Sequence, residues 1–411
     1  MRSRTAWLLK RARRQIWFGA AAISLFAVIV AATAGWLARH IPYEFTGDVG
    51  QDSVGTVLGI IASSMLAVTT FSLTAMVSAY GSATQLATPR ATQLLVSDPT
   101  AQRSLSTFLG AFIFAMVGII GLQTSLYGGQ GRVVLLIATV LLIALVVVTL
   151  LRWIAHLAGF GRMADVIDRV ENAACAAMAS FAADPHLGGA APAAVPDDAR
   201  PVAATTIGYV THVDVAAIDE VAVEHGLIVH VEAIAGTLVH PARPLVRVTG
   251  AALTDAAQQA LIGAFTIERH RSFDHDPRLG LIALSEIASR ALAPATNDPG
   301  TAIEVLNALL RALSLLPADT GAAVRHPRVH VPRPSIDDLL DDAFLPIVRE
   351  GVGEGEVALR LLTVLGALRT PLPHADASLR RIAARLRTNV ARGQRDEDEV
   401  RRFAAAYARF G

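Results

Sequence analysis

Residues 54–80 read VGTVLGIIASSMLAVTTFSLTAMVSAY, a stretch that carries no charged side chain. A helix needs about 20 apolar residues to cross the hydrocarbon core of a bilayer, so this stretch predicts a membrane-spanning helix. Ser63, Thr70, Thr74 and Ser78 follow one another at steps of seven, four and four, which places them on one side of that helix. We call these four residues the hydroxyl stripe. A spanning helix is expected to turn such a stripe toward other protein or toward water.

The composition also indicates a membrane protein. Of the 411 residues, 53% are hydrophobic and only 17% are charged. The first 160 residues hold eleven Lys and Arg against four Asp and Glu, whereas the remainder holds 25 against 31. This asymmetry predicts a membrane region followed by an acidic soluble region, and it argues against nucleic acid as a partner.

Two rare residue types exclude several kinds of chemistry. Lys10 is the only lysine, so the chain has no Walker A loop, no Schiff-base lysine and no modifiable carrier lysine. Cys175 is the only cysteine, which excludes an internal disulfide, a C-x-x-C redox pair and a cysteine zinc cluster. No G-x-S-x-G nucleophile motif occurs either. We therefore expect neither an enzyme nor a resident cofactor.

Three further apolar runs predict three further spans. Residues 16–37 follow a basic start and exceed the length of a signal-peptide core, so they predict an uncleaved first span. Residues 105–126 and 133–154 predict the third and fourth spans. Asp98-Pro99 predicts the capped start of the helix that leads into the third span. Gly110, Gly118 and Gly121 in the third span are expected to permit close approach of neighbouring helices. The fourth span is the most uniformly aliphatic and is expected to face lipid most.

The distribution of basic residues predicts the orientation of these spans. Six lysines and arginines precede the first span, two lie in the loop 81–103, and at least two follow the fourth span. Only Arg39 and Arg132 lie on the opposite side. The positive-inside rule then places both termini of this multi-pass protein in the cytoplasm.

The remainder predicts a soluble α+β domain. Residues 159–201 contain an amphipathic helix, 163–183, and a Pro/Gly/Ala-rich linker. Strand patterns at 205–213, 227–232 and 245–249 enclose a short helix at 215–225, so residues 202–250 predict a small β subdomain. Residues 251–411 predict a helical bundle whose helices begin at Asp276-Pro277, at Asp298-Pro299 and at Ser335. Pro346 is expected to end or kink the last of these. The predicted fold class is thus an integral membrane bundle of four spans (1–158), followed by this α+β domain.

Several segments together resemble one family. They are TPR at residues 88–90 after the second span, GYV at 208–210, GTLV at 236–239, RSFDHDPRLG at 271–280 and RALAPATNDPGTA at 290–302. With these motifs the chain resembles the uncharacterised bacterial predicted-membrane-protein family with the domain of unknown function DUF2254. The resemblance covers nearly the whole chain. It implies a multi-span amino-terminal half in the inner membrane and a characteristic soluble half, and it implies no particular activity.

The segment 231–245 also resembles half of a barrel-sandwich domain of the lipoyl or biotinyl type. Val231, Gly236, Val239 and Leu245 follow the half-motif, whereas Ala242 stands in place of its second glycine. Because the modifiable lysine is missing, such a fold would act as a compact adaptor rather than as a carrier.

Two polar clusters in the soluble half have both a functional and a structural interpretation. The first lies near Asp276 and consists of Glu268, His270, Arg271, Asp274, His275 and Asp276. Its residue types suggest metal ligands, but the spacing of His and Asp fits no zincin or facial-triad pattern. We therefore favour an Asp276 helix cap within a solvated loop. The second, Asn297-Asp298-Pro299, suggests a ligand site or a helix cap. For Arg290, we expect a buried pair with Asp276 or Asp298 rather than a ligand contact.

Two functional hypotheses from different classes remain open. In the first, the protein is a homo-oligomeric channel or transport-like protein in which the hydroxyl stripe lines the path and the soluble domain regulates it. In the second, it is a membrane-anchored scaffold or regulatory protein whose soluble domain binds a protein partner. The stripe would then serve helix packing. No acidic residue lies inside a predicted span, which argues against a proton relay or an ion-coupled pump.

The predicted orientation can be measured with single cysteines in a Cys175→Ser background. Gly47→Cys and Gly129→Cys should react with a membrane-impermeant thiol reagent added outside intact cells, because both positions lie in predicted outer loops. Gly189→Cys and Gly393→Cys should react only after the membrane is opened. Labelling of the last two from outside would reverse the orientation.

Overall fold

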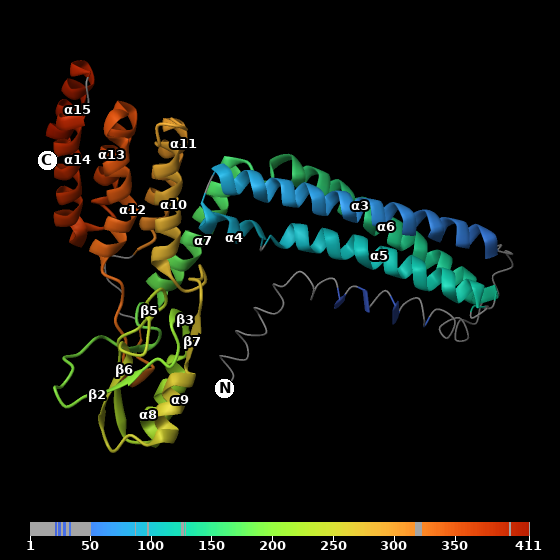
Figure 1. Cartoon of the computed structure of the whole chain (residues 1–411), viewed down its shortest axis with the longest axis horizontal. Coiled ribbons are helices and arrows are strands. Elements are labelled where there is room, and N and C mark those ends of the chain that lie inside the picture. The colour runs from blue at the N-terminus through green and yellow to red at the C-terminus, as the bar shows by residue number, and fades with distance from the viewer. Residues whose placement is uncertain are drawn as a thin grey trace. The chain divides into compact units, whose positions relative to one another are not determined.

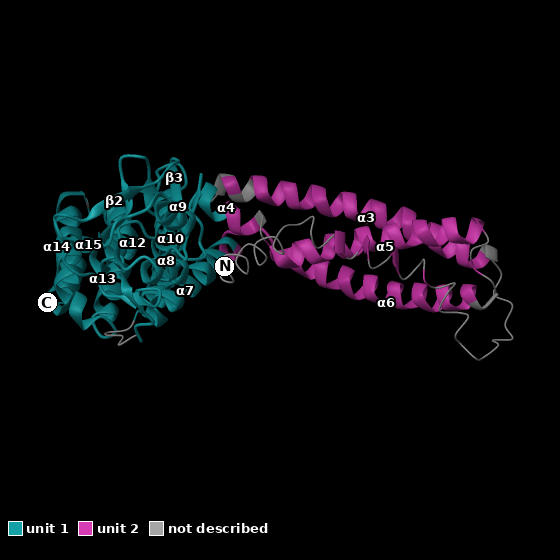
Figure 2. Ribbon diagram, turned by 90° about the horizontal axis from the view of Figure 1, so that it is seen from below, with its two compact units in different colours: residues 1–4, 86–91, 166–411 teal, residues 5–85, 92–165 magenta. Residues whose placement is uncertain are grey.

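The computed structural model describes residues 51–86, 88–96, 98–124, 127, 129–316, 323–393 and 396–410, with a few isolated positions between 21 and 33. The predicted first span, 16–37, therefore lies almost entirely outside the described residues. The chain divides into two compact units, which Figure 2 colours separately. We call described residues 51–85 and 92–165 the membrane unit. Residue 86, residues 88–91 and the described residues from Val166 onward form the soluble unit.

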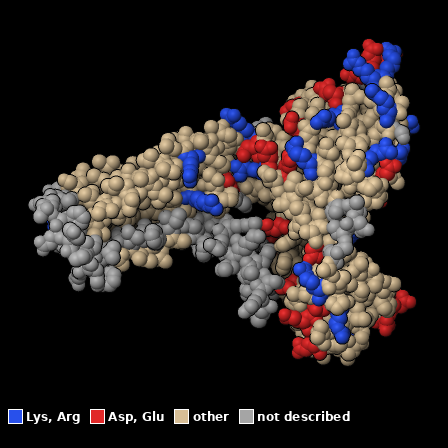
Figure 3. Space-filling view, turned by 180° about the vertical axis from the view of Figure 1, so that it is seen from behind, with Lys and Arg blue, Asp and Glu red and all other residues tan. Residues whose placement is uncertain are grey.

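The membrane unit consists of three long apolar helices that run side by side (Figures 1 and 2). They are α3 (Gln51–Leu86), α5 (Pro99–Gln123) and α6 (Gly129–Gly159). Within the described part of the chain, three segments are long and apolar enough to cross a membrane: Ser53–Gly81, Pro99–Gln123 and Gly131–Gly159. They coincide with the predicted second, third and fourth spans. In space-filling view this unit shows few charged residues, whereas charges of both signs cover the soluble unit (Figure 3).

Glycine allows the three helices to pack closely. A Cβ atom on Gly118 of α5 would lie 3.0 Å from Leu58 of α3 and 3.6 Å from Leu135 of α6. Gly121, one turn further along, accommodates the ring of Tyr127 in the same way. Gly118 thus permits the close approach of helices that was predicted for the third span, whereas Gly121 makes room for a residue of the connection between α5 and α6. Of the three spans, α5 is the most buried, and α6 is the least buried, as expected for the most lipid-facing span.

The connection between α3 and α5 differs from the predicted loop 81–103. Helix α3 continues to Leu86, a short helix α4 (Pro89–Val96) follows, and α5 begins at Pro99. Pro89 therefore begins a helix, and the side chain of Thr88 accepts a hydrogen bond from the backbone N–H of Ala91. Asp98 caps α5 as predicted, accepting from the backbone N–H groups of residues 100 and 101. Proline fits here because the first helical residues need no N–H donor.

The first part of the soluble unit combines helices with two small sheets. After α7 (Met163–Ala183), the strands form one sheet in the order β1-β8-β4-β6-β2 and another in the order β5-β3-β7. Helices α8 (Val215–Glu224) and α9 (Asp255–Gly263) complete this part, and residues of both contribute to its apolar core. The strands are β1 (Gly189–Ala190), β2 (Arg200–Ala203), β3 (Gly208–Val213), β4 (Leu227–Val231), β5 (Leu238–Val239), β6 (Pro244–Gly250), β7 (Phe265–Glu268) and β8 (His326–His330).

This β-containing part extends well beyond the predicted subdomain 202–250. The predicted linker contributes β1 and the start of β2, and the region predicted to be helical contributes β7 and β8. Strand β8 pairs in parallel with β4, about a hundred residues earlier, and also with β1. Such short strands carry too few residues for an alternating pattern, so only their pairing defines them. A mixed sheet with a helix between β3 and β4 also differs from the barrel-sandwich fold.

The second part of the soluble unit is a set of packed helices (Figure 1). Neighbouring pairs in this set are α10–α12, α10–α11, α11–α13, α12–α14 and α13–α15. The helices are α10 (Pro277–Ala291), α11 (Pro299–Leu313), α12 (Ile336–Glu350), α13 (Gly355–Leu368), α14 (Asp376–Gly393) and α15 (Glu397–Phe410). Helix α12 does not end at Pro346 but continues to Glu350. Burial of Ile347 and Val348, both fully inaccessible, offsets the hydrogen bond that proline cannot make.

Helix α7 packs against α10 so closely that the contact requires glycine. A Cβ atom on Gly280 would lie 2.5 Å from the Cβ atom and 2.7 Å from the Cα atom of Ala174. We expect Gly280→Ala to destabilise the soluble unit by about 1–3 kcal/mol through overpacking. Gly263→Ala is the matched control, because nothing lies within 4 Å of a Cβ atom there. Thermal unfolding of the full chain in detergent, followed by circular dichroism, measures both; equal melting temperatures would contradict the close contact.

Candidate functional site

A buried carboxylate connects the two parts of the soluble unit. Asp276 is 1% exposed, and its Oδ1 accepts hydrogen bonds from the backbone N–H groups of Arg278 and Leu279 at the start of α10. Its Oδ2 accepts from Nε of Arg271 at 2.6 Å. A carboxylate can be buried at this depth because both oxygens have donors and one of these carries a positive charge.

Gly236, from the turn before β5, lies against this ion pair. Its φ angle is +88°, which favours glycine, and a Cβ atom there would lie 2.4 Å from Oδ2 of Asp276 and 2.9 Å from Nη2 of Arg271. The same turn exchanges backbone hydrogen bonds with β3, from Gly236 N–H to Val210 O and from Val210 N–H to Thr237 O. The motifs GYV, GTLV and RSFDHDP thus meet at one place, although they lie up to 66 residues apart in the printed sequence.

The remaining motif, residues 290–302, forms an exposed turn. Asn297 and Asp298 are both exposed, and Asn297 has a φ angle of +46°. Asp298 caps α11. Its carboxylate accepts hydrogen bonds from the backbone N–H of Thr301 at 3.0 Å and from the side-chain hydroxyl of Thr301 at 2.6 Å. These bonds from Thr301 hold the pKa of Asp298 below its usual range. Pro299 takes the first helical position of α11, as the capping interpretation predicts.

The buried Arg290 pair expected from the sequence is wrong. Arg290 is exposed near the end of α10. The carboxylate of Asp276 pairs with Arg271 instead, and the carboxylate of Asp298 is held by Thr301. The spacing along the sequence did not distinguish these partners, because Arg271 precedes Asp276 within a loop rather than on a helix.

The polar cluster near Asp276 does not assemble a metal site. In the described residues, no three His, Cys, Asp or Glu side chains come together in an arrangement that would hold a metal ion. The ring of His275 lies 5.2 Å from that of His212 on β3, and Asp274 shares hydrogen bonds with Ser272. The geometry supports the structural interpretation of this loop.

In the membrane unit, the hydroxyl stripe lies on an exposed side of α3. Ser63, Thr70, Thr74 and Ser78 are all exposed. At 3.6 residues per turn, the stripe is centred about 180° around the helix from the side that packs against α5 and α6. The buried residues of α3 are Val54, Leu58, Ile61, Ala62, Met65, Ser72 and Met76. The stripe therefore does not hold α3 to the described helices of its own unit.

Three hydroxyls of the stripe bond to the backbone of α3 itself. Ser63 Oγ donates to Gly59 O, Thr70 Oγ1 to Leu66 O, and Thr74 Oγ1 to Thr70 O, each at 3.0 Å. Such bonds satisfy the O–H donor and leave the oxygen lone pairs available as acceptors. The arrangement thus lets the stripe face either lipid or water.

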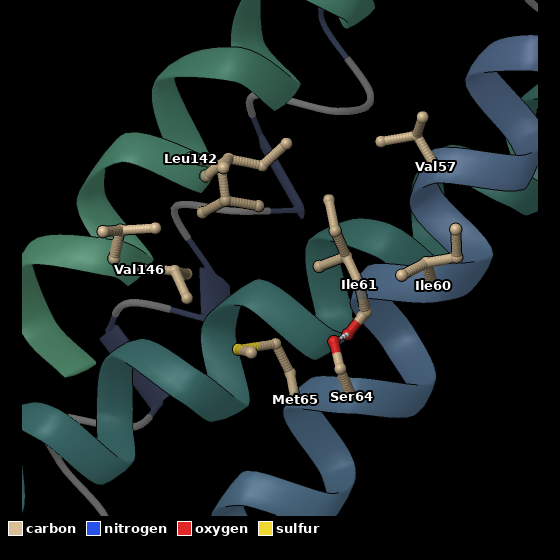
Figure 4. A pocket seen from close by; sticks show the side chains of 9 residues that line it. Val57, Ile60, Ile61, Ser64, Met65, Leu142 and Val146 are labelled. Carbon is tan, nitrogen blue, oxygen red and sulfur yellow. Dashed lines mark hydrogen bonds between the residues drawn. The ribbon is translucent and has the colours of Figure 1, made fainter.

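An apolar groove of about 260 Å³ runs beside the stripe between α3 and α6 (Figure 4). Ser64 contributes the one hydroxyl among its lining residues, and it donates to Ile61 O at 3.2 Å. The lining residues are Val57, Ile60, Ile61, Ser64, Met65, Leu142, Ile143, Val146 and Val147. The groove therefore offers an apolar surface with no charged group.

One polar cluster of the membrane unit was not predicted. Asp98 lies at the start of α5 and is 3% exposed. Its Oδ2 atom lies 2.5 Å from Nε2 of His156 on α6. Trp153, one turn earlier on α6, donates from Nε1 to Ser72 Oγ of α3 at 2.9 Å. These contacts join all three spans near one end of the unit. The Asp98 cap was visible in the sequence, but its partner on a helix 58 residues away was not.

The fold and these contacts define a membrane protein: apolar helices long enough to span a bilayer precede a soluble α+β region. The match to a family model makes this specific. Residues 13–367 match the model described as "Predicted membrane protein (DUF2254)", and the chain belongs to this family. A search of the curated proteins and a search of the solved structures each found no match.

The two Asp-Pro caps allow a matched test of the Asp276 contact. Asp298→Ala removes an exposed cap and should cost about 1–2 kcal/mol of stability. Asp276→Ala removes a buried cap and leaves Arg271 without its partner, so it should cost about 3–5 kcal/mol. Thermal unfolding of the full chain in detergent, followed by circular dichroism, compares them. Equal losses would show that the ion pair with Arg271 adds nothing beyond capping.

Proposed function

We propose that the protein is a homo-oligomeric, channel-like membrane protein in which the hydroxyl stripe of α3 lines a path at the contact between copies. One observation carries this proposal: the stripe is exposed and points away from the helices that α3 packs against. Lipid offers no partner to the oxygen lone pairs that remain free on these hydroxyls, whereas water or a second protein surface does. Several copies that turn α3 toward a common axis would give all four hydroxyls such surroundings.

The chemistry of the stripe favours a neutral or hydrated solute. The segment Ser53–Gly81 contains no Asp, Glu, Lys or Arg. Each back-bonded hydroxyl keeps lone pairs that accept from water, and large apolar side chains flank the stripe on both sides; Leu66, Phe71, Leu73 and Val77 are all at least 52% exposed. Those flanking side chains suit contacts between copies.

The proposal includes the location and orientation of the molecule. The arginines near the span ends support an inner membrane location with both termini and the soluble unit in the cytoplasm. The soluble unit would then act on the path from the cytoplasmic side. Residues 88–90 support this role, because Arg90 of α4, between α3 and α5, forms an ion pair with Glu286 of α10.

A second candidate function is a membrane-anchored scaffold whose soluble unit binds a protein partner. The back-bonded hydroxyls of Ser63, Thr70 and Thr74 favour it, because a hydroxyl that donates to its own helix is tolerated in lipid. In that case α3 needs neither water nor a second copy.

Thr74→Leu separates these functions. If the stripe lines a water-filled path, the leucine narrows and dries it, so solute flux into liposomes should fall while oligomer mass in detergent stays unchanged. Thr84→Leu is the matched control, because Thr84 is exposed and back-bonded in the same way but lies beyond the segment Ser53–Gly81.

The other two outcomes contradict the path. A loss of oligomer mass would show that the stripe packs copies together, since small residues let helices approach. Unchanged flux and mass would show that the stripe faces lipid, which favours the scaffold.

A further inference from the structure

The helices α10, α12 and α14 border an open pocket of about 470 Å³ in the soluble unit. Its size lies within the range of about 300–1,000 Å³ that is typical of small-molecule sites. The lining residues are Ile282, Ser285, Glu286, Asp341, Asp342, Leu345, Pro346, Arg349 and Arg385. One wall is therefore apolar, and the others carry charges of both signs.

A buried hydroxyl in this pocket has no partner. Ser285 is 1% exposed, and its Oγ atom makes no hydrogen bond with any of the described residues. Hydroxyls in spanning helix α3 bond to carbonyls one turn earlier, but this one does not. Burying a hydroxyl without a partner is costly, so a group that accepts its hydrogen would be stabilised here.

The charges of the pocket are not equally compensated. Each carboxylate has an arginine: Glu286 pairs with Arg90, Asp341 with Arg381 at 2.8 Å, and Asp342 with Arg278 at 2.6 Å. These three arginines do not line the pocket.

The two arginines that do line it have little compensation. Within the described part of the chain, Arg349 forms one ion pair, with its neighbour Glu350 on the exposed surface. Arg385 is exposed and makes no ion pair or hydrogen bond with any residue that the structure describes. The uncompensated charge at the pocket is thus positive, and guanidinium groups bind oxyanions well.

We propose that this pocket binds a small organic oxyanion, a carboxylate or a phosphate ester with a short apolar body. The oxyanion contacts Arg385 and Arg349, and the apolar body lies against Ile282, Leu345 and Pro346. Solvent does not reach Ser285 Oγ in this structure, so a shift of the neighbouring side chains accompanies binding and lets one oxygen of the ligand accept its hydrogen. Glu286 also lines the pocket, and its carboxylate forms the ion pair with Arg90. Any effect of the ligand on a path rests on the proposed function, whereas binding itself does not.

The test measures binding to the full chain in detergent by calorimetric titration. The two probes are phenyl phosphate, a phosphate ester, and benzoate, a carboxylate. The two controls are benzyl alcohol, which lacks the charge, and inorganic phosphate, which lacks the apolar body. We expect at least one of the two aromatic oxyanions to bind. Phenyl phosphate should bind more tightly than inorganic phosphate, and benzoate should bind more tightly than benzyl alcohol. Absence of binding by both oxyanions at millimolar concentration would overturn the proposal.

Two variants locate the site. Arg385→Gln should weaken binding by about tenfold or more, since a hydrogen bond between charged groups is lost. Arg392→Gln is the matched control, because Arg392 is exposed on the same helix but does not line the pocket. Equal affinities of the two variants would overturn the proposal.

Ser285→Ala distinguishes a ligand contact from a structural role. We expect about fivefold or greater weakening of binding, together with an unliganded melting temperature equal to or above that of the unaltered chain, because the removed hydroxyl has no partner to lose. A lower melting temperature, or unchanged affinity, would show that this hydroxyl does not serve the ligand.

Discussion

The buried carboxylate of Asp276 is the constraint on which the soluble unit depends. It cannot be buried without donors, and it obtains them from the start of α10 and from Arg271. Gly236 must be glycine for the turn before β5 to reach the same carboxylate. The β-containing part and the helical part are therefore joined by one charged contact, which brings together three of the sequence motifs, GYV, GTLV and RSFDHDP.

The membrane unit obeys a different constraint, because no hydrophobic effect drives helices together in lipid. Close approach at Gly118 and the polar contacts of Asp98 and Ser72 hold the three described spans together. Helix α3 satisfies this constraint with one side only. Its other side carries hydroxyls whose surroundings are not supplied by the described helices, and the proposed function follows from that asymmetry.

Glu286 of α10 lines the pocket between α10, α12 and α14 and also contacts the segment between α3 and α5. Its pairing with Arg90 means that the charge balance of the pocket includes a residue of the short connection between two spans. If the soluble unit regulates a path, as proposed, this ion pair is a contact through which a ligand in the pocket would act, because a ligand influences another position only through contacts that differ between its bound and unbound states.

The sequence by itself determined the features that depend on neighbouring residues. The described spans were found from the length of their apolar runs, and the caps at Asp98, Asp276, Asp298 and Ser335 from bonds that reach only two or three residues along the chain. Only the tertiary structure decided which partners meet across long separations. The pairing of β8 with β4, the choice of Arg271 over Arg290, the exposed direction of the hydroxyl stripe and the surroundings of Ser285 all depend on it. The physical reason is that an amphipathic pattern shows which residues share a side of a helix or strand, but not what that side packs against.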